Sequence, residues 1–455
     1  MTTRLRFATV LAGIFLLAAS DGEAYPGGGA VDPGVRATTG TEGGPIANLT
    51  GGQGALFNRS KEIFSEVERL ADGLGPRFNL DSCAGCHSQP AIGGTSPATN
   101  PQVAIATAFG ATNKLPSFIT ANGPIREARF KLNGAGAPDG SVHSLFVITG
   151  RNDGSLPAGK ANNCNIAQEN FSQQTYNSSG NIALRIPTPV FGMGLIEEIP
   201  EATLMANLAA NASTKRSLGI SGFFNHNPND GRITRFGWKA QNMSGLLFAG
   251  EAYNVEMGIT SELFPVERDE TAGCQFSTTP NSVTDTAQAA PNDALSDIER
   301  FSAFMRFLAP PAPSTTVPGG ATSITHGKSL FASVGCSQCH TPQLTTGGAT
   351  VAALSNQQVN LYSDIALHHM GPGLGEAITQ GAAGGEDFRT APLWGLGQRI
   401  FLLHDGRTSD LVVAIQAHSS SNPSGDCSEA DAVINNYSRL SASDQQDLLN
   451  FLRSL

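Results

Sequence analysis

The sequence predicts a mainly α-helical protein made of two related units, with a loop and β-hairpin insertion in the first unit. Three observations lead to this prediction. The pattern Cys-x-x-Cys-His occurs twice, at residues 83–87 and 336–340. Amphipathic stretches with helical spacing of apolar residues lie near the ends of both units. Two alternating apolar and polar segments lie between the two patterns, and such alternation is typical of a hairpin.

Cys-x-x-Cys-His is the attachment sequence of c-type haem. Cysteines three positions apart lie on one helical turn, so both sulfurs can reach one porphyrin edge, and the adjacent histidine can bind the iron. We therefore predict two covalently bound c-type haems, and each unit is expected to be a cytochrome c-like domain. The residues that would bind them are Cys83, Cys86 and His87 in the first pattern and Cys336, Cys339 and His340 in the second.

Two other kinds of site use similar cysteine spacings. A zinc site normally has four ligands, whereas each pattern offers three. A thioredoxin-type redox pair lies beside a βαβ unit and needs no adjacent histidine, and the sequence predicts no such unit. A chance match could explain one pattern in a chain with 7 cysteines, but not two.

Length and charge restrict the class of protein. The chain has 455 residues, enough for two or three domains, and its 52 glycines and 26 prolines indicate long loops. The net charge of -10 argues against a nucleic-acid partner. It permits a basic electron-donor protein as a partner.

Residues 1–24 are expected to be a signal peptide. Two arginines precede an apolar run over residues 7–19, and Gly22-Glu23-Ala24 is a suitable cleavage site. The run is short for a membrane span, and no later stretch is long and apolar enough to be one. The mature protein is therefore predicted to be periplasmic or secreted, without a membrane span.

The first unit, residues 56–310, is expected to follow an exposed, flexible leader at residues 25–55. A helix is predicted at residues 60–74. Residues 91–180 are interpreted as an insertion beside the first haem. Inside this insertion, segments 126–132 and 144–149 predict the hairpin.

A helix at residues 296–308, with Ser296 and Glu299 as a capping box, is expected to close the first unit. Prolines then mark the boundary, and the second unit spans residues 311–455. A short helix at residues 326–331 leads into the second pattern, and a helix capped by Ser441 ends the chain. Phe78 and Phe331 each lie five residues before a pattern, which suggests related units.

Three cysteines lie outside the patterns. In an oxidising compartment two of them can form a disulfide. The pairing that we favour is Cys164 with Cys274, because both lie in loop-like sequence of the first unit. One thiol would then remain free, and that thiol would be Cys427.

The chain also resembles the dihaem oxidoreductase family, over most of residues 55–455. That family is related to the bacterial dihaem cytochrome c peroxidases, to the methylamine-utilisation dihaem enzyme and, more distantly, to the dihaem rubber oxygenases. The segments that carry the resemblance are Phe78–Gly94, Arg185–Gly194, Gly237–Ala240, Asn254–Thr260, Leu361–Leu374, Phe388–Gly397 and His404–His418.

The resemblance implies that the N-terminal haem, bound by His87, reacts with hydrogen peroxide and that the C-terminal haem, bound by His340, relays electrons. The peroxidase relatives have a methionine fourteen residues after the histidine that matches His404, and this chain has His418 there. His418 is therefore the expected second ligand of the relay haem, the alternative being a surface histidine. Ligation by two histidines gives a lower potential than His/Met ligation, which suits oxygen chemistry or an unusual donor.

A second departure from the peroxidases concerns the reactive haem. Those enzymes carry a removable distal histidine shortly before the segment that matches residues 185–187. Here no histidine lies between His143 and Arg185, so the reactive haem is expected to keep a free coordination position. The alternative is that His226 reaches the iron through the fold.

The resemblance also assigns roles to residues outside the patterns. Glu256 matches the distal glutamate, and a carboxylate in an apolar pocket can move a proton between the two peroxide oxygens; the alternative is a surface acid. Trp238 matches the tryptophan between the haems, and the alternative is core packing. His404, His368 and Arg389 are expected to orient haem propionates or loops. Calcium is found among the relatives, but no loop here has a calcium signature.

Three functions remain open from the sequence. The first is an exported dihaem peroxidase that takes electrons from a donor protein. The second is a dihaem oxygenase or a cofactor-maturing oxidase that uses oxygen. The third is a non-catalytic electron-transfer cytochrome, which requires both irons to be fully ligated.

Overall fold

The computed structural model describes residues 29–108, 110–111, 113–140, 144–150, 180–269, 274–275, 277, 279–420 and 426–455. These residues form a mixture of helices and four small antiparallel sheets. The prediction of a mainly α-helical fold is therefore right for the longest elements but omits most of the sheets. No helix in this described part of the chain is long and apolar enough to cross a membrane.

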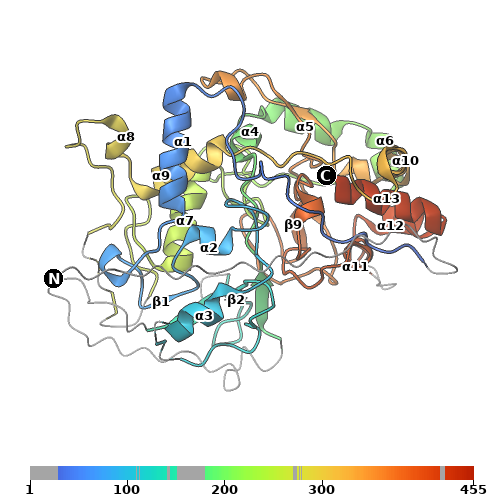
Figure 1. Cartoon of the computed structure of the whole chain (residues 1–455). Coiled ribbons are helices and arrows are strands. Elements are labelled where there is room, and N and C mark those ends of the chain that lie inside the picture. Colours follow the sequence, from blue (N-terminus) through green and yellow to red (C-terminus); the bar gives the residue numbers. More distant parts are fainter. Residues whose placement is uncertain are drawn as a thin grey trace, which may run out of the picture.

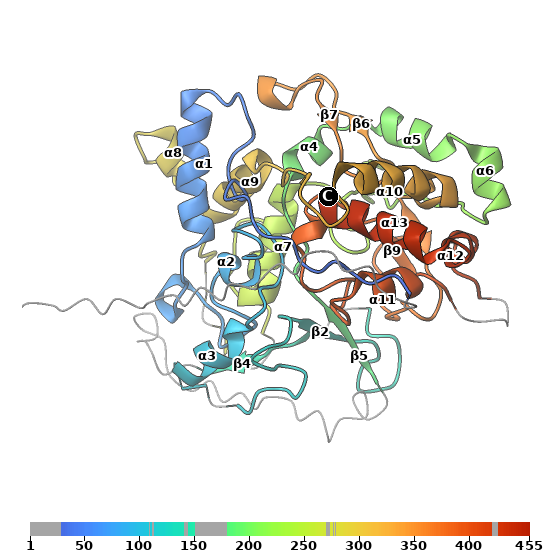
Figure 2. The same cartoon turned by 45° about the vertical axis from the view of Figure 1, so that its right-hand side comes forward.

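Two pairs of packed helices organise the fold (Figure 1, Figure 2). In the first pair, α1 (Gly51–Phe64) packs against α9 (Asp297–Phe307), which also contacts α7 (Gly245–Met257). In the second pair, α10 (Gly320–Val334) packs against α13 (Ala442–Ser454). The remaining helices are α2 (Cys83–Cys86), α3 (Pro101–Ala108), α4 (Met193–Glu197), α5 (Glu201–Ala209), α6 (Ala212–Ser217), α8 (Pro291–Ala294), α11 (Leu411–Gln416) and α12 (Asp431–Ser438).

The same aromatic arrangement occurs in both helix pairs. Phe64 of α1 meets Phe301 edge-on, with ring centroids 5.9 Å apart, and Phe331 of α10 meets Phe451 at 5.4 Å. Phe64 also lies 6.1 Å from the His87 ring, and Phe331 lies 6.3 Å from the His340 ring. The structural counterpart of Phe331 is therefore Phe64. The sequence had suggested Phe78, which instead lies in strand β1 (Arg77–Phe78).

The predicted hairpin is present, and it forms part of a three-stranded sheet. Strand β2 (Glu127–Phe130) pairs with β3 (Ser144–Leu145) on one side and with β5 (Ile182–Arg185) on the other. Strand β4 (Ile148–Thr149), which was expected to continue the hairpin, pairs with β1 just before the first pattern. The other two sheets join β6 (Leu344–Thr345) to β7 (Gln358–Val359) and β8 (Leu367–His369) to β9 (Asp387–Arg389).

Helix boundaries were predicted best where a capping residue marks them. Ser296 and Ser441 cap α9 and α13 as expected. The helix predicted at residues 60–74 begins earlier and ends earlier, because Thr50 and Gln53 form a capping box at the start of α1. Residues 70–72 form a short 3-10 helix (Leu70–Asp72); three others are Cys336–Gln338, Ala352–Leu354 and Leu396–Gln398.

The two units share their apolar cores. Residues Leu354, Leu361 and Ile365 lie in the second unit of the sequence but pack in the core formed by α1, α7 and α9. Ile220, from the first unit, packs instead with α10 and α13. The chain crosses between the two cores more than once, and the predicted boundary at residue 310 therefore does not separate them.

Residues 29–50 belong to the segment expected to be an exposed leader, yet they pack against the C-terminal part of the chain. The Asp32 carboxylate forms an ion pair of 2.6 Å with Arg453, and these side chains are 8% and 1% exposed. The Arg36 backbone N–H donates to Gly397 O at 2.8 Å, and Ile46 is buried. The predicted signal peptide, residues 1–24, lies outside the described residues.

Replacing Asp32 with Asn should lower the free energy of unfolding by about 3 kcal/mol, because it leaves a buried guanidinium without its carboxylate. Despite burial, hydrogen bonds from Arg453 and Leu411 lower the pKa of Asp32 below 3.8. The stabilisation is therefore complete above that value and disappears as the pH falls through the lowered native pKa. Denaturant titrations at pH 7 and pH 3 measure this. Glu62→Gln, in an exposed pair with Arg59, is the control and should change little.

Cys274 is disulfide-bonded, in agreement with its predicted pairing. Its predicted partner, Cys164, lies outside the described residues. The four cysteines of the two patterns form no disulfide, and neither does the exposed Cys427.

Candidate functional site

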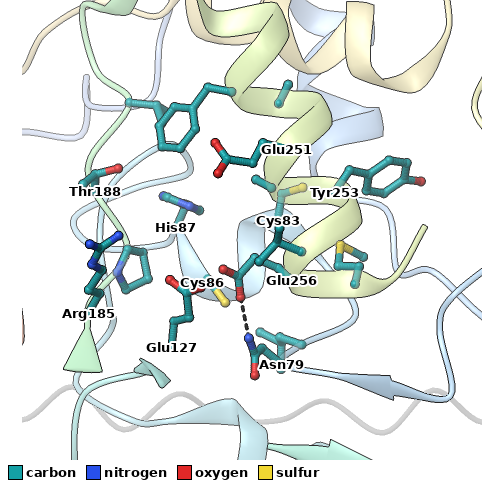
Figure 3. A pocket seen from close by; sticks show the side chains of 18 of the residues that line it. Asn79, Cys83, Cys86, His87, Glu127, Arg185, Thr188, Glu251, Tyr253 and Glu256 are labelled. Carbon is teal, nitrogen blue, oxygen red and sulfur yellow. Dashed lines mark hydrogen bonds between the residues drawn. The ribbon is translucent and has the colours of Figure 1, made fainter. Parts of the chain in front are cut away.

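Each Cys-x-x-Cys-His pattern lines a large cavity. The first cavity encloses about 1200 Å³ and lies between α2, α7, α9 and strands β2 and β5. Figure 3 shows His87 facing this space, with Glu256, Glu127 and Glu251 around it. The second cavity encloses about 1540 Å³ and is lined by residues of α10, α11, α12 and α13.

The two patterns adopt the same local geometry. The backbone N–H of His87 donates to Cys83 O at 3.0 Å, and that of His340 donates to Cys336 O at 2.9 Å. These helix-type bonds place both thiols and the histidine of each pattern on one turn, as the spacing predicts. All six side chains line their cavities.

Three histidines are held in the same way. Nδ1 lies 2.9 Å from Gly94 O in His87, 3.0 Å from Tyr362 O in His340 and 2.8 Å from Ala414 O in His418. A carbonyl can only accept, so Nδ1 carries the proton and Nε2 keeps a free lone pair. This second interaction is the usual way to orient a histidine that binds a metal. No other histidine of the described residues has this contact to a backbone carbonyl.

His340 and His418 line the same cavity, so His418 is not a surface residue. Burial and then the nearby His418 lower the pKa of His340 to about 4, and burial also lowers the pKa of His418. Both imidazoles are therefore neutral, which is the form that binds a metal.

The Glu256 carboxylate lies in the wall of the first cavity, near the C-terminal end of α7. Asn79 Nδ2 donates to its Oε2 at 2.6 Å, and the Asn79 side chain is fixed in turn because Val147 N donates to its Oδ1 at 3.2 Å. Burial, followed by the charge of Glu127, raises the pKa of Glu256. The surface-acid alternative for Glu256 does not agree with this position.

Trp238 lies between the two cavities and lines both. Its Nε1 donates to Ile186 O at 3.1 Å, and Ile186 also lines both cavities. On the side of the second cavity, the indole meets the His404 ring edge-on, with centroids 6.3 Å apart. The predicted tryptophan is therefore a half-buried side chain that, with Ile186, lies at the boundary between the two cavities.

A family model described as "Di-haem oxidoreductase, putative peroxidase" matches residues 148–455. The chain belongs to this family. As a dihaem oxidoreductase it uses haem cofactors, in agreement with the two patterns. The matched residues contain the second pattern but begin after the first.

Two other comparisons add little to this assignment. No curated protein sequence matches the chain. A solved structure of Kuenenia stuttgartiensis hydrazine synthase, pressurised with xenon, is 15% identical over 36% of this chain and 56% of its own, with a TM-score of 0.24. That likeness is too low to bear on the fold or the function of this dihaem oxidoreductase.

The residues of the second cavity also fit the acidic groups of a haem. Arg389 and Arg399 line it, and burial lowers the pKa of each to about 10. Among the described residues neither has a carboxylate partner, and their only hydrogen bonds go to backbone carbonyls such as Gly237 O and Pro392 O. Two buried cations without counter-ions suit propionates, as the sequence suggested for Arg389.

The other sequence-predicted histidines have different positions. His404 stacks on Phe388 with centroids 4.4 Å apart and lines the second cavity. Both ring nitrogens of His368 bind carboxylates, Nε2 to Asp364 at 3.0 Å and Nδ1 to Glu429 at 2.6 Å. His368 thus has no nitrogen free for a propionate. His226 is exposed and absent from the first cavity, which removes it as a distal ligand.

Sequence reasoning gave no role to several charged residues of the first cavity, among them Glu127, Arg129 and Glu251. Arg129 Nε lies 2.5 Å from Glu127 Oε1. Although burial opposes it, the charges of Glu127, Glu256 and Glu251 raise the pKa of Arg129. One signal was available, because strand alternation places Glu127 and Arg129 on the same face of β2.

Proposed function

We propose that this dihaem oxidoreductase is an exported peroxidase, which reduces hydrogen peroxide in the first cavity with electrons relayed from the second. One observation carries the proposal. Glu256 and His87 face the same cavity, while Trp238 lines that cavity and the next one. A proton-transfer group and an electron path therefore meet at one place.

The residues that would hold the two haems follow from the cavity walls. Covalent attachment through the two thiols of each pattern is part of the proposal, with His87 on the first iron. His340 and His418, which line the same cavity with free Nε2 atoms, would both bind the second iron. When bound, the haems supply irons that can take up electrons one at a time and deliver them to an oxidant.

Reduction of hydrogen peroxide to two water molecules consumes two electrons and two protons. In our proposal, Glu256 moves a proton from the inner peroxide oxygen to the outer one, which then leaves as water. Asn79 holds Oε2 by its 2.6 Å hydrogen bond, so Oε1 is the oxygen available to the peroxide. Because burial raises the Glu256 pKa, the carboxyl can hold and release a proton near neutral pH.

The arrangement of histidines supports an open position in the first cavity. His87 is the only histidine among the described residues that line it. By contrast, the second cavity contains two histidines with free Nε2 atoms. One iron would therefore be five-coordinate and reactive, and the other six-coordinate.

Electron paramagnetic resonance of the oxidised protein tests this proposal. The expected spectrum contains one high-spin and one low-spin ferric iron in equal amounts. Two low-spin irons, with no reaction on addition of peroxide, would instead support a non-catalytic electron-transfer cytochrome.

An oxygenase or cofactor-maturing oxidase is the second candidate. It is favoured by the presence of His418 where the peroxidase relatives have methionine, because two histidine ligands lower the potential of the relay haem. The reduced protein separates the two functions. A peroxidase should consume peroxide with oxidation of a donor, whereas an oxygenase should consume oxygen when peroxide is absent.

A further inference from the structure

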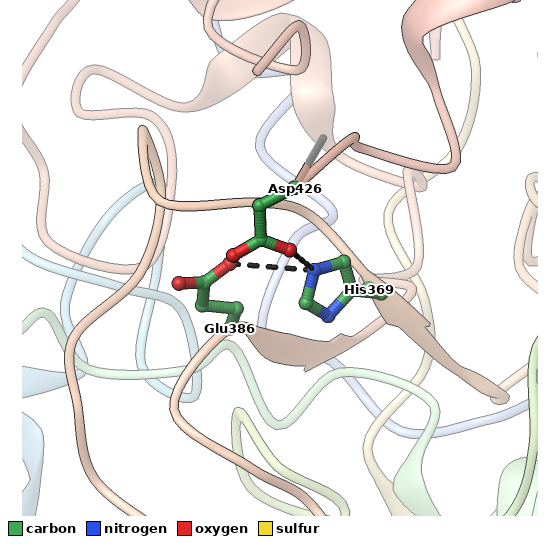
Figure 4. Close-up of side chains that lie close together, drawn as sticks. All are labelled: His369, Glu386 and Asp426. Carbon is green, nitrogen blue, oxygen red and sulfur yellow. Dashed lines mark hydrogen bonds and ion pairs between the residues drawn. The ribbon is translucent and has the colours of Figure 1, made fainter. Parts of the chain in front are cut away.

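A cluster of metal-binding side chains lies outside the lining of both cavities. His369, Glu386 and Asp426 each offer a ligand atom, and these atoms lie within 4.8 Å of one another. His369 Nε2 lies 3.0 Å from an Asp426 oxygen and 3.3 Å from a Glu386 oxygen. Figure 4 shows the two carboxylates turned toward each other beside the imidazole. The sequence analysis did not single out any of these residues.

The other nitrogen of His369 is held by a fourth residue. Nδ1 lies 3.1 Å from Asp387 Oδ1, and Asp387 is itself fixed because Gly384 N donates to its Oδ2 at 2.8 Å. A carboxylate on one imidazole nitrogen, with the second nitrogen facing further ligands, is the usual outer arrangement of a histidine that binds a metal. Asp387 thus orients His369 for binding through Nε2.

The two carboxylates of the cluster also favour the binding of a cation. Glu386 Oε2 makes no hydrogen bond, and its nearest charged neighbour is His369 Nε2 at 3.3 Å. Two facing carboxylates repel each other unless a proton or a cation lies between them. A divalent ion would neutralise both and would also satisfy the Glu386 oxygen.

We propose that His369, Glu386 and Asp426 bind a divalent transition-metal ion of the zinc class. One imidazole nitrogen and two carboxylate oxygens are common ligands of zinc, and water could complete a tetrahedral site. Calcium prefers six to eight oxygen ligands, so an imidazole in the centre of the cluster disfavours it.

The position of the cluster gives the ion a structural role. His369 ends β8, Glu386 precedes β9, and Asp426 lies shortly before α12. Residues of α12 line the second cavity, and the nearby Glu429 binds His368. The ion would fasten the segment that follows His418 to the β8–β9 hairpin, and it would thereby stabilise one wall of that cavity.

Zinc binding to the haem-loaded full chain tests the proposal. After removal of bound metal with a chelator, the wild-type protein should bind one Zn²⁺ per chain more than the His369→Gln and Glu386→Gln variants, as measured by calorimetry and by metal analysis against haem iron. The Asp387→Asn variant should bind with about 10–100-fold lower affinity. Added Zn²⁺ should raise the melting temperature of the wild type but not of His369→Gln.

His326 provides a matched control. It is an exposed histidine, and its Nδ1 lies 2.8 Å from Asp447. Asp444 lies 3.9 Å from its other nitrogen, Nε2, so the two carboxylates face different ring nitrogens and do not form a three-ligand cluster in the described part of the chain. His326→Gln should therefore keep the wild-type zinc stoichiometry. Equal zinc binding by the wild type, His369→Gln and Glu386→Gln would overturn the proposal, and so would a failure of the wild type to bind. Unchanged haem absorption verifies that each variant is folded, and the result does not depend on peroxidase activity.

Discussion

The Glu256→Gln variant should react with hydrogen peroxide about 10²–10⁴-fold more slowly than the wild type, while its haem absorption spectra stay nearly unchanged. The glutamine side chain has almost the same shape and can still contact Asn79, which donates a hydrogen bond to Glu256. It cannot accept the proton from one peroxide oxygen and pass it to the other. Stopped-flow mixing of the protein with peroxide measures the rate directly.

Two comparison variants make this result specific. Glu262→Gln removes an exposed carboxylate soon after the end of α7, and it should leave the rate unchanged. Glu251→Gln removes another carboxylate of the same cavity, which accepts a hydrogen bond from Asn242. If Glu251→Gln were slow and Glu256→Gln were as fast as the wild type, proton transfer would have to be reassigned to Glu251.

Features encoded within a few residues were predictable from the sequence. The haem patterns are an example, because their spacing alone places two thiols and a histidine on one turn, and the backbone bonds to Cys83 O and Cys336 O reproduce that turn. The caps at Ser296 and Ser441 are similar, since a cap depends on the first turn of its own helix. The turns of the two patterns and the two helix caps depend on hydrogen bonds between neighbouring residues, so they could be predicted without knowledge of the rest of the fold.

Features that depend on contacts between distant segments were not predictable in the same way. Asp32 is buried in an ion pair with Arg453, which lies 421 residues later in the sequence. Nothing near Asp32 in the sequence indicates this contact, so residues 29–50 were predicted to be an exposed leader. Spacing alone had matched Phe78 with Phe331, whereas the structural counterpart of Phe331 is Phe64, which the packing of α1 on α9 brings beside His87.

The candidate sites differ in the same respect. Resemblance to the family pointed to Glu256 and Trp238, but Glu127 and Arg129 reach the first cavity only through the pairing of β2 with β5. The cluster at His369 combines three segments that are up to 57 residues apart, as the contact with Asp426 shows. No spacing rule connects such residues before the fold is known.

Replacing His418 with Met should raise the reduction potential of one haem by roughly 0.1 V or more, within the span of about 0.8 V that axial ligands cover. A thioether favours the ferrous state more than an imidazole does. His418 lines the second cavity with His340, and Ala414 O orients its ring, so the change is confined to one iron. Spectroelectrochemical titration of the two haems measures both potentials in one experiment.

The control for this experiment is His326→Met, which alters an exposed histidine outside both cavities and should shift neither potential. If His418→Met also left both potentials unchanged, His418 would not be an iron ligand. The argument for a low-potential relay, and with it the case for an oxygenase, would then lose its basis. If the potential rises as expected, the variant should accept electrons from donors of higher potential, because the residue at position 418 would then set the potential of the relay haem.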